Sequence, residues 1–431
     1  MSILEGSRYQ SYVYGYPHKT AYRPIEPALP LGPLWASERR DALFLYFHIP
    51  FCEQRCGFCN LFTQPVPEDD RVDAYLATLA RQVHVVRRAL DEGGEFRIAR
   101  AAIGGGTPTL LDAKQLDRMF ALVEHMGYVG APMSVETSPE TALPDRIGVA
   151  VGRGADRISI GVQSFIDSEV KAVNRPQKVH DVHRALRTIR DAGAKTLNID
   201  LMYGLPGQTA ETWETSLRSA LEYKPEELYL YPLYVRPLTT LGRKQIEAVD
   251  AHRVALYEQA GALLRSAGYH QISMRMFKRG DAPSTNGVAY CCQADGMVGL
   301  GCGARSYTTS VHYSSEWAVG ARGVRGIIDR WITRTDEEFA VADYGFVLDE
   351  SEQRRRWLIL SLLSDEGLDL ATYRARFGEV EALDELVARG WIAEGANTLR
   401  LTAEGLARAD MIGPYLYTGA VHQRMATYEL T

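Results

Sequence analysis

The chain has 431 residues, of which 46% are hydrophobic and 24% charged, and its formal net charge at pH 7 is −6. This near-average composition excludes a disordered, collagen-like or coiled-coil protein. At roughly 150 residues per domain, the length predicts two or three domains, or one large α/β barrel with an appendage. Nucleic acid is not an expected partner, because affinity for nucleic acid depends on neutralising phosphates and this chain is acidic.

Hydropathy and cysteine placement indicate the cellular compartment. Residues 1–8 lack the basic and apolar regions of a signal peptide, and no window reaches the roughly 18 to 20 apolar residues of a membrane span. We therefore expect a cytoplasmic protein without a membrane partner. Six cysteines are too few for a disulfide-stapled secreted scaffold. Three of them, Cys52, Cys56 and Cys59, lie close together, which predicts a thiolate-ligated metal in a reducing compartment.

Residues 1–40 are rich in tyrosine and proline. Proline resists regular structure, and tyrosine side chains favour an apolar surface to lie on. We expect this N-terminal arm to be ordered and wrapped over the main domain.

Strands and helices alternate in the next part of the chain. Apolar spacing predicts strands over 43–49, 98–103, 133–137, 157–162, 196–202 and 227–234, and helices over 70–90, 113–125, 179–192 and 210–222. Six such units imply an α/β fold, a partial (β/α)6 barrel over residues 41–240. Functional side chains are then expected at the C-terminal ends of the strands.

The alternation weakens after Arg236, and two further regions are predicted. Residues 241–345 are interpreted as a barrel extension and substrate-site region, with a helix over 250–267, a strand over 270–276 and a glycine-rich stretch at 296–307. Helices over 353–363, 370–377, 379–389 and 403–410 and short strands at 391–392 and 398–401 predict a winged-helix-like α+β domain over 346–431. Its arginine run at 354–356 is interpreted as a solvated helix face.

The three clustered cysteines have the spacing C-x3-C-x2-C and directly follow a predicted strand. Three thiolates can each bind one iron of a 4Fe–4S cluster and leave the fourth iron without a protein ligand. An open coordination position allows a small molecule to bind the metal directly. A zinc site is the alternative, but a structural zinc needs four protein ligands, and the nearest candidate, His48, precedes the loop.

This motif resembles the signature of the radical S-adenosylmethionine (radical SAM) superfamily. The segment from Tyr46 through His48 to Cys52 resembles one branch, the oxygen-independent coproporphyrinogen III oxidase-like proteins, and the similarity runs from about Leu43 to Gly413. The resemblance implies a 4Fe–4S cluster and S-adenosylmethionine (SAM) as cofactors. It also implies reductive cleavage of SAM to methionine and a 5′-deoxyadenosyl radical, with electrons from a flavodoxin- or ferredoxin-like donor.

The resemblance also assigns a SAM site. Residues 104–109 match the family's GGGTPT motif, in which glycines let the backbone approach a ligand closely and expose its N–H groups. An arginine fork suits the SAM carboxylate because its two donors match the two oxygens. The residues carried over as cofactor-binding are Tyr46, Phe58, Gly105, Gly106, Thr107, Glu136, Gln163, Arg175 and Asp200.

Three functions fit the branch: porphyrinogen decarboxylation, haem binding by a chaperone, and tailoring of a natural product. In the porphyrinogen decarboxylase the motif continues as C-x3-C-x2-C-x-C, and this chain has Leu61 at the last position. In the haem chaperone, a binding protein, a later motif reads H-N-x-x-Y-W. Here Asn286 and Tyr290 are present, one residue further apart than in that motif, but Thr285 and Cys291 replace the histidine and tryptophan.

The third function, tailoring of a natural product, is the one that we favour from the sequence. Segments 59–63, 231–239 and 16–24 resemble members associated with natural-product methylation or cyclopropane formation. Such enzymes bind two SAM molecules, and the second supplies the one-carbon unit that is added to an sp² carbon. A separate methyltransferase is then a possible partner.

Tyr290, Cys291 and Cys292 are candidate catalytic residues, as donors of a hydrogen atom or proton to the reacting substrate. The alternative is that both cysteines are small buried hydrophobes, as free cysteines usually are. Cys302 has no assigned role.

Overall fold

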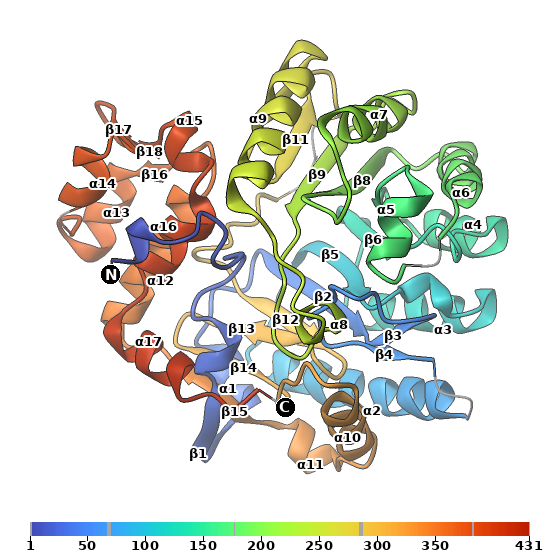
Figure 1. Cartoon of the computed structure of the whole chain (residues 1–431). Helices are drawn as coiled ribbons and strands as arrows, with labels where there is room; N and C mark the ends of the chain where they lie inside the picture. Colours follow the sequence, from blue (N-terminus) through green and yellow to red (C-terminus); the bar gives the residue numbers. More distant parts are fainter. Residues whose placement is uncertain (1, 67–69, 176, 284–287, 382, 431) are drawn as a thin grey trace.

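The computed structural model describes residues 2–66, 70–175, 177–283, 288–381 and 383–430. Within these residues, its main sheet has 13 strands in the order β1-β15-β14-β13-β12-β2-β5-β6-β7-β8-β9-β11-β10 (Figure 1). Six neighbouring strands are parallel and consecutive along the barrel: β2 (Leu43–Ile49), β5 (Ile98–Gly105), β6 (Met133–Thr137), β7 (Arg157–Gln163), β8 (Thr196–Tyr203) and β9 (Glu227–Pro232). The predicted α/β fold with a partial (β/α)6 barrel is confirmed.

Helices cover the outer face of these strands (Figure 1). They are α2 (Arg71–Glu92), α3 (Ala113–His125), α4 (Pro144–Gly152), α5 (Asp167–Ala172), α6 (Val179–Asp191) and α7 (Ala210–Leu221). Side chains alternate along β2, so that Leu45 and Phe47 are buried against the helices while Phe44 and Tyr46 face the opposite side. We call this opposite side of the sheet the inner face.

The predicted strand over 270–276 is wrong, because the chain reverses there. It forms a hairpin of β10 (Tyr269–Gln271) and β11 (Met276–Arg279) after α9 (Asp250–Ser266). The Ser273 hydroxyl accepts hydrogen bonds from the backbone N–H groups of Arg275 (3.3 Å) and Met276 (3.1 Å). This local side-chain capping stabilises the turn that ends β10.

A largely antiparallel extension continues the barrel beyond β2. It contains β12 (Met297–Leu300), β13 (Arg305–Tyr307), β14 (Val311–Ser314), β15 (Val341–Val347) and β1 (Arg23–Pro30), with α1 (Leu31–Ala36), α10 (Ala321–Ile332) and α11 (Asp336–Phe339) beside them. The glycine-rich stretch forms β12 and β13 because Gly299 passes very close to Arg305. A Cβ on Gly299 would lie 2.2 Å from the Arg305 carbonyl oxygen.

The arm begins with η1 (Ile3–Glu5) and η2 (Lys19–Ala21) and passes between the barrel and the C-terminal helices (Figure 1). The Ser11 N–H donates to the Asp410 carbonyl oxygen (3.2 Å), and the Tyr16 hydroxyl bonds the Glu352 carboxylate. Beyond Tyr22 the arm becomes β1, which pairs antiparallel with β15. Residues of the arm are therefore held by segments more than 300 positions away in the chain.

The C-terminal region contains α12 (Glu350–Leu362), β16 (Leu368–Asp369), α13 (Leu370–Phe377), α14 (Asp384–Ala388), β17 (Ile392–Glu394), β18 (Thr398–Leu401), α15 (Ala403–Leu406), α16 (Ala409–Tyr415) and α17 (Gly419–Ala426). Its small sheet has the order β16-β18-β17. The winged-helix-like assignment of this region stays a prediction.

The interpretation of the arginine run at 354–356 as a solvated face is wrong for Arg356. This side chain is buried and donates to the carbonyl oxygens of Cys292 (2.8 Å) and Thr308 (3.3 Å). Its charge therefore binds the C-terminal region to the barrel extension. Among the described residues, no helix is long and apolar enough to cross a membrane.

Candidate active site

The cysteine loop lies at the C-terminal end of β2, where the parallel strands deliver functional groups. Cys52 ends the short strand β3 (Phe51–Cys52), which pairs with β4 (Gln64–Pro65), and all three cysteines are half-buried. The backbone of Gly57 ties the cysteine loop to two other segments of the chain. Its N–H donates to the Val173 carbonyl oxygen (2.7 Å), and its carbonyl accepts from the N–H of Leu241 (2.9 Å) in α8 (Thr240–Arg243).

The three thiols fit an iron–sulfur cluster better than a single zinc ion. Within the described part of the chain, no three His, Cys, Asp or Glu side chains converge on one metal position. Zinc needs its ligands around one tetrahedral centre, whereas each thiolate of a 4Fe–4S site binds a different iron. Burial and the neighbouring Cys59 raise the pKa of Cys52 to about 12, so that a bound metal must displace its proton.

The glycines at 104–106 are required by close packing. A Cβ on Gly104 would lie 2.7 Å from the Glu136 carboxylate, and one on Gly106 would lie 2.4 Å from the Phe51 carbonyl oxygen and 2.9 Å from the Cys52 sulfur. Gly105 has φ +116°, in the region that favours glycine. These glycines therefore bring Glu136 and the cysteine strand to the same loop, which the short helix η3 (Pro108–Leu110) follows.

The expectation that this loop exposes free N–H groups is wrong. The N–H of Gly105 donates to the Glu136 carboxylate (3.0 Å), that of Gly106 to the Ile49 carbonyl (2.7 Å) and that of Thr107 to the Phe51 carbonyl (2.7 Å). The open polar group is the Glu136 carboxylate, which is exposed on the inner face. Surrounding protein raises its pKa, while the Gly105 N–H opposes that shift. A carboxylate here suits the ammonium group of an amino acid.

Arg175 bridges the cysteine loop and β7. Its guanidinium donates to the Cys56 sulfur (3.2 Å), to the Gln177 side-chain oxygen (2.6 Å) and to the Gly161 carbonyl. Gln163, at the end of β7, has φ +67°, a strained value for a residue with a side chain. Arg175 is thus placed beside the cluster loop, although in this arrangement its donors bind groups of the chain itself.

Asp200 lies on the neighbouring strand, where it pairs in register with Gly161. Its carboxylate accepts a hydrogen bond from the Asn198 amide (2.7 Å), and burial raises its pKa to about 7.

On β2, the Tyr46 hydroxyl contacts a ring nitrogen of His48 at 3.0 Å. Phe58 packs on a small apolar cluster that includes Leu241. The expected contacts of Tyr46, Phe58 and Asp200 with SAM remain predictions.

The structure does not bring Tyr290, Cys291 and Cys292 to the cysteine loop. The Tyr290 ring packs edge-to-face on Phe44 (5.3 Å between ring centroids), at the start of β2, whereas Cys52 follows the end of that strand. Both thiols donate to the Gln293 side-chain oxygen, at 3.1 and 3.3 Å. Thr285 and Asn286 lie outside the described residues. The catalytic role of this group stays a prediction.

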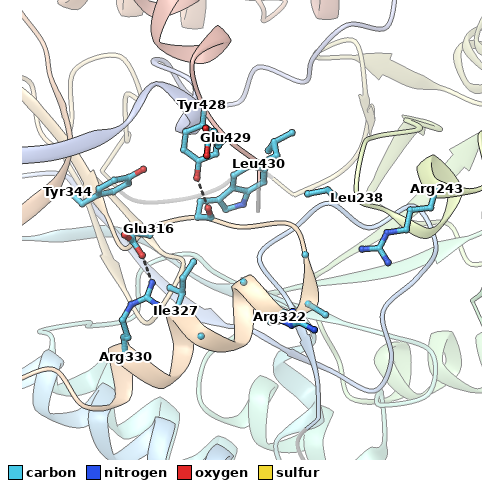
Figure 2. A pocket seen from close by; sticks show the side chains of 15 residues that line it. Leu238, Arg243, Glu316, Arg322, Ile327, Arg330, Tyr344, Tyr428, Glu429 and Leu430 are labelled. Carbon is cyan, nitrogen blue, oxygen red and sulfur yellow. Dashed lines mark hydrogen bonds and ion pairs between the residues drawn. The ribbon is translucent and has the colours of Figure 1, made fainter.

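A surface hollow of about 940 Å³ lies between α8, α10 and the C-terminal tail (Figure 2). Arg243 of α8 and Arg322 of α10 line it, and Tyr428 donates to the Trp317 carbonyl oxygen at its edge. The ammonium of Lys19, in the arm, lies 3.8 Å above the centre of the Trp317 ring. No sequence motif marks Lys19 or Trp317, so sequence reasoning did not place these residues beside a hollow.

Comparisons with known proteins place this site in a family. Residues 46–220 match the model of the Radical SAM superfamily. The chain is 31% identical over 366 residues to the oxygen-independent coproporphyrinogen III oxidase of Paracoccus denitrificans, covering 78% of this chain and 77% of that protein. It is 29% identical over 377 residues to the haem chaperone HemW of Escherichia coli, covering 84% and 95%. The solved structure of E. coli coproporphyrinogen III oxidase (HemN) covers 94% of this chain and 97% of that chain, with a TM-score of 0.78 at 23% identity, which shows a shared fold.

The fold and the cysteine loop therefore define a member of the radical SAM superfamily, whose cofactors are a 4Fe–4S cluster and SAM. Within that superfamily, the chain belongs to the branch that contains the oxygen-independent coproporphyrinogen III oxidases and HemW.

The favoured interpretation as a natural-product methyltransferase or cyclopropane-forming enzyme is wrong, because the relatives are porphyrinogen oxidases and haem chaperones. Residues in two of the three segments used for it, 231–239 and 16–24, have structural roles. Tyr231 stacks on Tyr229 (6.0 Å), Thr239 caps α8, and Tyr16 anchors the arm to Glu352. These contacts hold the chain's own elements together and do not specify methyl transfer.

Proposed function

We propose that this protein is an oxygen-independent coproporphyrinogen III oxidase, which converts propionate side chains of its substrate to vinyl groups with loss of CO₂. For each side chain, one hydrogen atom would leave in 5′-deoxyadenosine, and the remaining electron would pass to an electron acceptor. The observation that carries the proposal is the meeting of the cysteine loop with Glu136 and Arg175 at one edge of the inner face. A substrate on this inner face would lie beside the cofactors. The similarity to the Paracoccus oxidase supports the choice of substrate.

The protein's own groups would position the cofactors. Cys52, Cys56 and Cys59 would hold the cluster, and the Glu136 carboxylate would accept the SAM ammonium group. When bound, the cluster supplies the electron for the reductive cleavage of SAM. Because that electron comes from outside, we include a flavodoxin- or ferredoxin-like donor in the proposal. Leu61, in place of the oxidase's further cysteine, is 49% exposed and leaves the three proposed ligands unchanged.

The test is anaerobic turnover by protein reconstituted with iron and sulfide, in the presence of a reductant, SAM and coproporphyrinogen III. We expect 5′-deoxyadenosine to form together with a divinyl porphyrinogen. The binding of two SAM molecules also remains to be measured, by equilibrium dialysis of the reconstituted protein. 5′-Deoxyadenosine formation that is unaffected by coproporphyrinogen III, without a decarboxylated product, would contradict the proposal.

The haem chaperone is the second candidate, and the match to nearly the whole length of HemW favours it. It predicts stable haem binding and no decarboxylation. The same preparation distinguishes the two functions, because it can be titrated with haem and assayed for the divinyl product.

A further inference from the structure

Arg305 stands at the same level of the sheet as Tyr46. In the register of the strands, Tyr46 on β2 is opposite Gly299 on β12, which lies beside Arg305 on β13. Paired residues on neighbouring strands point to the same side of a sheet. A Cβ on Gly299 would lie 2.2 Å from the Arg305 carbonyl oxygen, so the backbone of β13 packs tightly on β12 and no β12 side chain stands between Tyr46 and Arg305 at this level.

Lys19 reaches the same region from the arm. Its ammonium rests on the Trp317 ring, and its charge interacts with Arg305, with the Tyr14 phenol and with Cys59 of the cysteine loop. The Arg305 guanidinium lies 4.6 Å from the centre of the Tyr14 ring. Tyr14 is 48% exposed, so that open surface remains beside the two cations.

Neither cation is neutralised by the protein. Among the described residues, Lys19 and Arg305 contact aromatic rings and form no ion pair with a carboxylate. Burial raises the pKa of Tyr14, but Arg305 and Lys19 together lower it below its usual value. By contrast, Arg157 on the opposite side of the barrel has its own partner, Glu227, at 2.7 Å. A partly buried cation without a counter-charge is costly unless a ligand supplies one.

We propose that Lys19 and Arg305 form a carboxylate subsite, which holds an acidic side chain of the substrate on the inner face beside the SAM site. The inference rests on the proposed function, because coproporphyrinogen III carries propionates. Arg305 presents a planar fork that matches two carboxylate oxygens, and Lys19 adds a point charge from the arm. The hollow in Figure 2, on whose edge Trp317 lies, places this subsite close to solvent.

The subsite is tested by fluorescence titration of the reconstituted protein with coproporphyrin III and, separately, with its tetramethyl ester. The ester removes the negative charges and keeps the ring. We expect the wild-type protein to bind the free acid at least about tenfold more tightly than the ester. Lys19→Met and Arg305→Met are each expected to weaken binding of the acid by roughly ten- to hundredfold, the range of a charge-assisted hydrogen bond, and to leave binding of the ester unchanged.

Matched controls separate the subsite from folding defects. Lys19→Arg and Arg305→Lys keep the charges and should keep most of the preference for the acid, whereas Lys195→Met removes an exposed lysine elsewhere. Iron content and SAM cleavage without porphyrin should be unchanged in every variant. Equal binding of acid and ester by the wild-type protein, or variants with unchanged affinity for the acid, would overturn the subsite. Tight charge-dependent binding without turnover would overturn only the oxidase function.

Discussion

The two sides of the inner face are built in different ways. On the cofactor side, the cysteine loop, the glycines at 104–106 and Glu136 lie at the C-terminal ends of the neighbouring strands β2, β5 and β6. On the opposite side, Lys19 and Arg305 come from segments 286 residues apart, and they meet because the arm packs on the barrel extension. The comparison teaches that the proposed cofactor residues lie in short motifs, whereas the proposed substrate residues come together only through long-range assembly.

The largest effect is expected on the cofactor side, from Cys52→Ser. Loss of one thiolate removes a proposed cluster ligand, so iron content and the visible absorbance of the cluster should be lost together with SAM cleavage. Cys302→Ala is the matched control, because Cys302 is a buried cysteine outside the C-x3-C-x2-C motif, with its N–H bonded to the Tyr75 hydroxyl. Equal iron loss in both variants would contradict the ligand assignment.

Motifs made this side of the site predictable. The C-x3-C-x2-C spacing, the glycine loop and the six strands follow from local sequence, and the structure has the first strand at Leu43–Ile49, as predicted. The structure corrects the details that depend on partners. The N–H groups of the glycine loop bind Ile49, Phe51 and Glu136, which no local pattern indicates.

The side of the inner face that carries Lys19 and Arg305 was not predictable, because its contacts join segments that are distant in the sequence. A charged residue in a helix, such as Arg356, is normally solvated, but here Cys292 and Thr308 offer buried carbonyls to it. The pairing of β1 with β15 joins residues more than 300 positions apart. Periodicity reports which face of an element is apolar, and it carries no information about which distant segment covers that face.

A second, smaller effect on the cofactor side is expected from Gly106→Ala. The new Cβ would meet the Phe51 backbone and the Cys52 sulfur, neither of which can move without displacing β3. We expect at least a roughly tenfold loss of SAM cleavage with partial loss of iron, since a shift of about 1 Å in a site is costly. The control is Gly148→Ala in α4, where a Cβ has no neighbour within 4 Å and alanine favours the helix. Normal cluster content in Gly106→Ala would be incompatible with this packing.

Paired and unpaired arginines should differ in their contribution to stability. Arg275 forms a buried ion pair with Asp410 (2.6 Å), and the two side chains are 3% and 1% exposed. Arg275→Met should cost about 3–5 kcal/mol in the free energy of unfolding, because it leaves a buried charge unpaired. Arg305→Met should cost much less, because it leaves no carboxylate behind. Chemical denaturation of both variants is the measurement, and equal losses would show that Arg305 is structural.

The smallest expected effect is a dependence of kcat/KM on pH, which tests whether Lys19 binds the substrate. Burial lowers the pKa of Lys19 to about 8, with Arg305 and Arg236 adding to the shift while Tyr14 and Cys59 oppose it. The protonated form binds a carboxylate, so kcat/KM, which reports the free enzyme, should fall as the pH rises through about 8. Lys19→Arg should move this fall to higher pH, because the arginine stays charged. An unchanged pH profile in that variant would remove Lys19 from substrate binding.

The most direct test of the proposed oxidase uses coproporphyrinogen III labelled with ¹³C in its propionate carboxyl groups, supplied anaerobically with SAM and reductant to the reconstituted protein. The proposed oxidase releases labelled CO₂ in step with 5′-deoxyadenosine and a divinyl porphyrinogen. Formation of 5′-deoxyadenosine with no labelled CO₂ would contradict it.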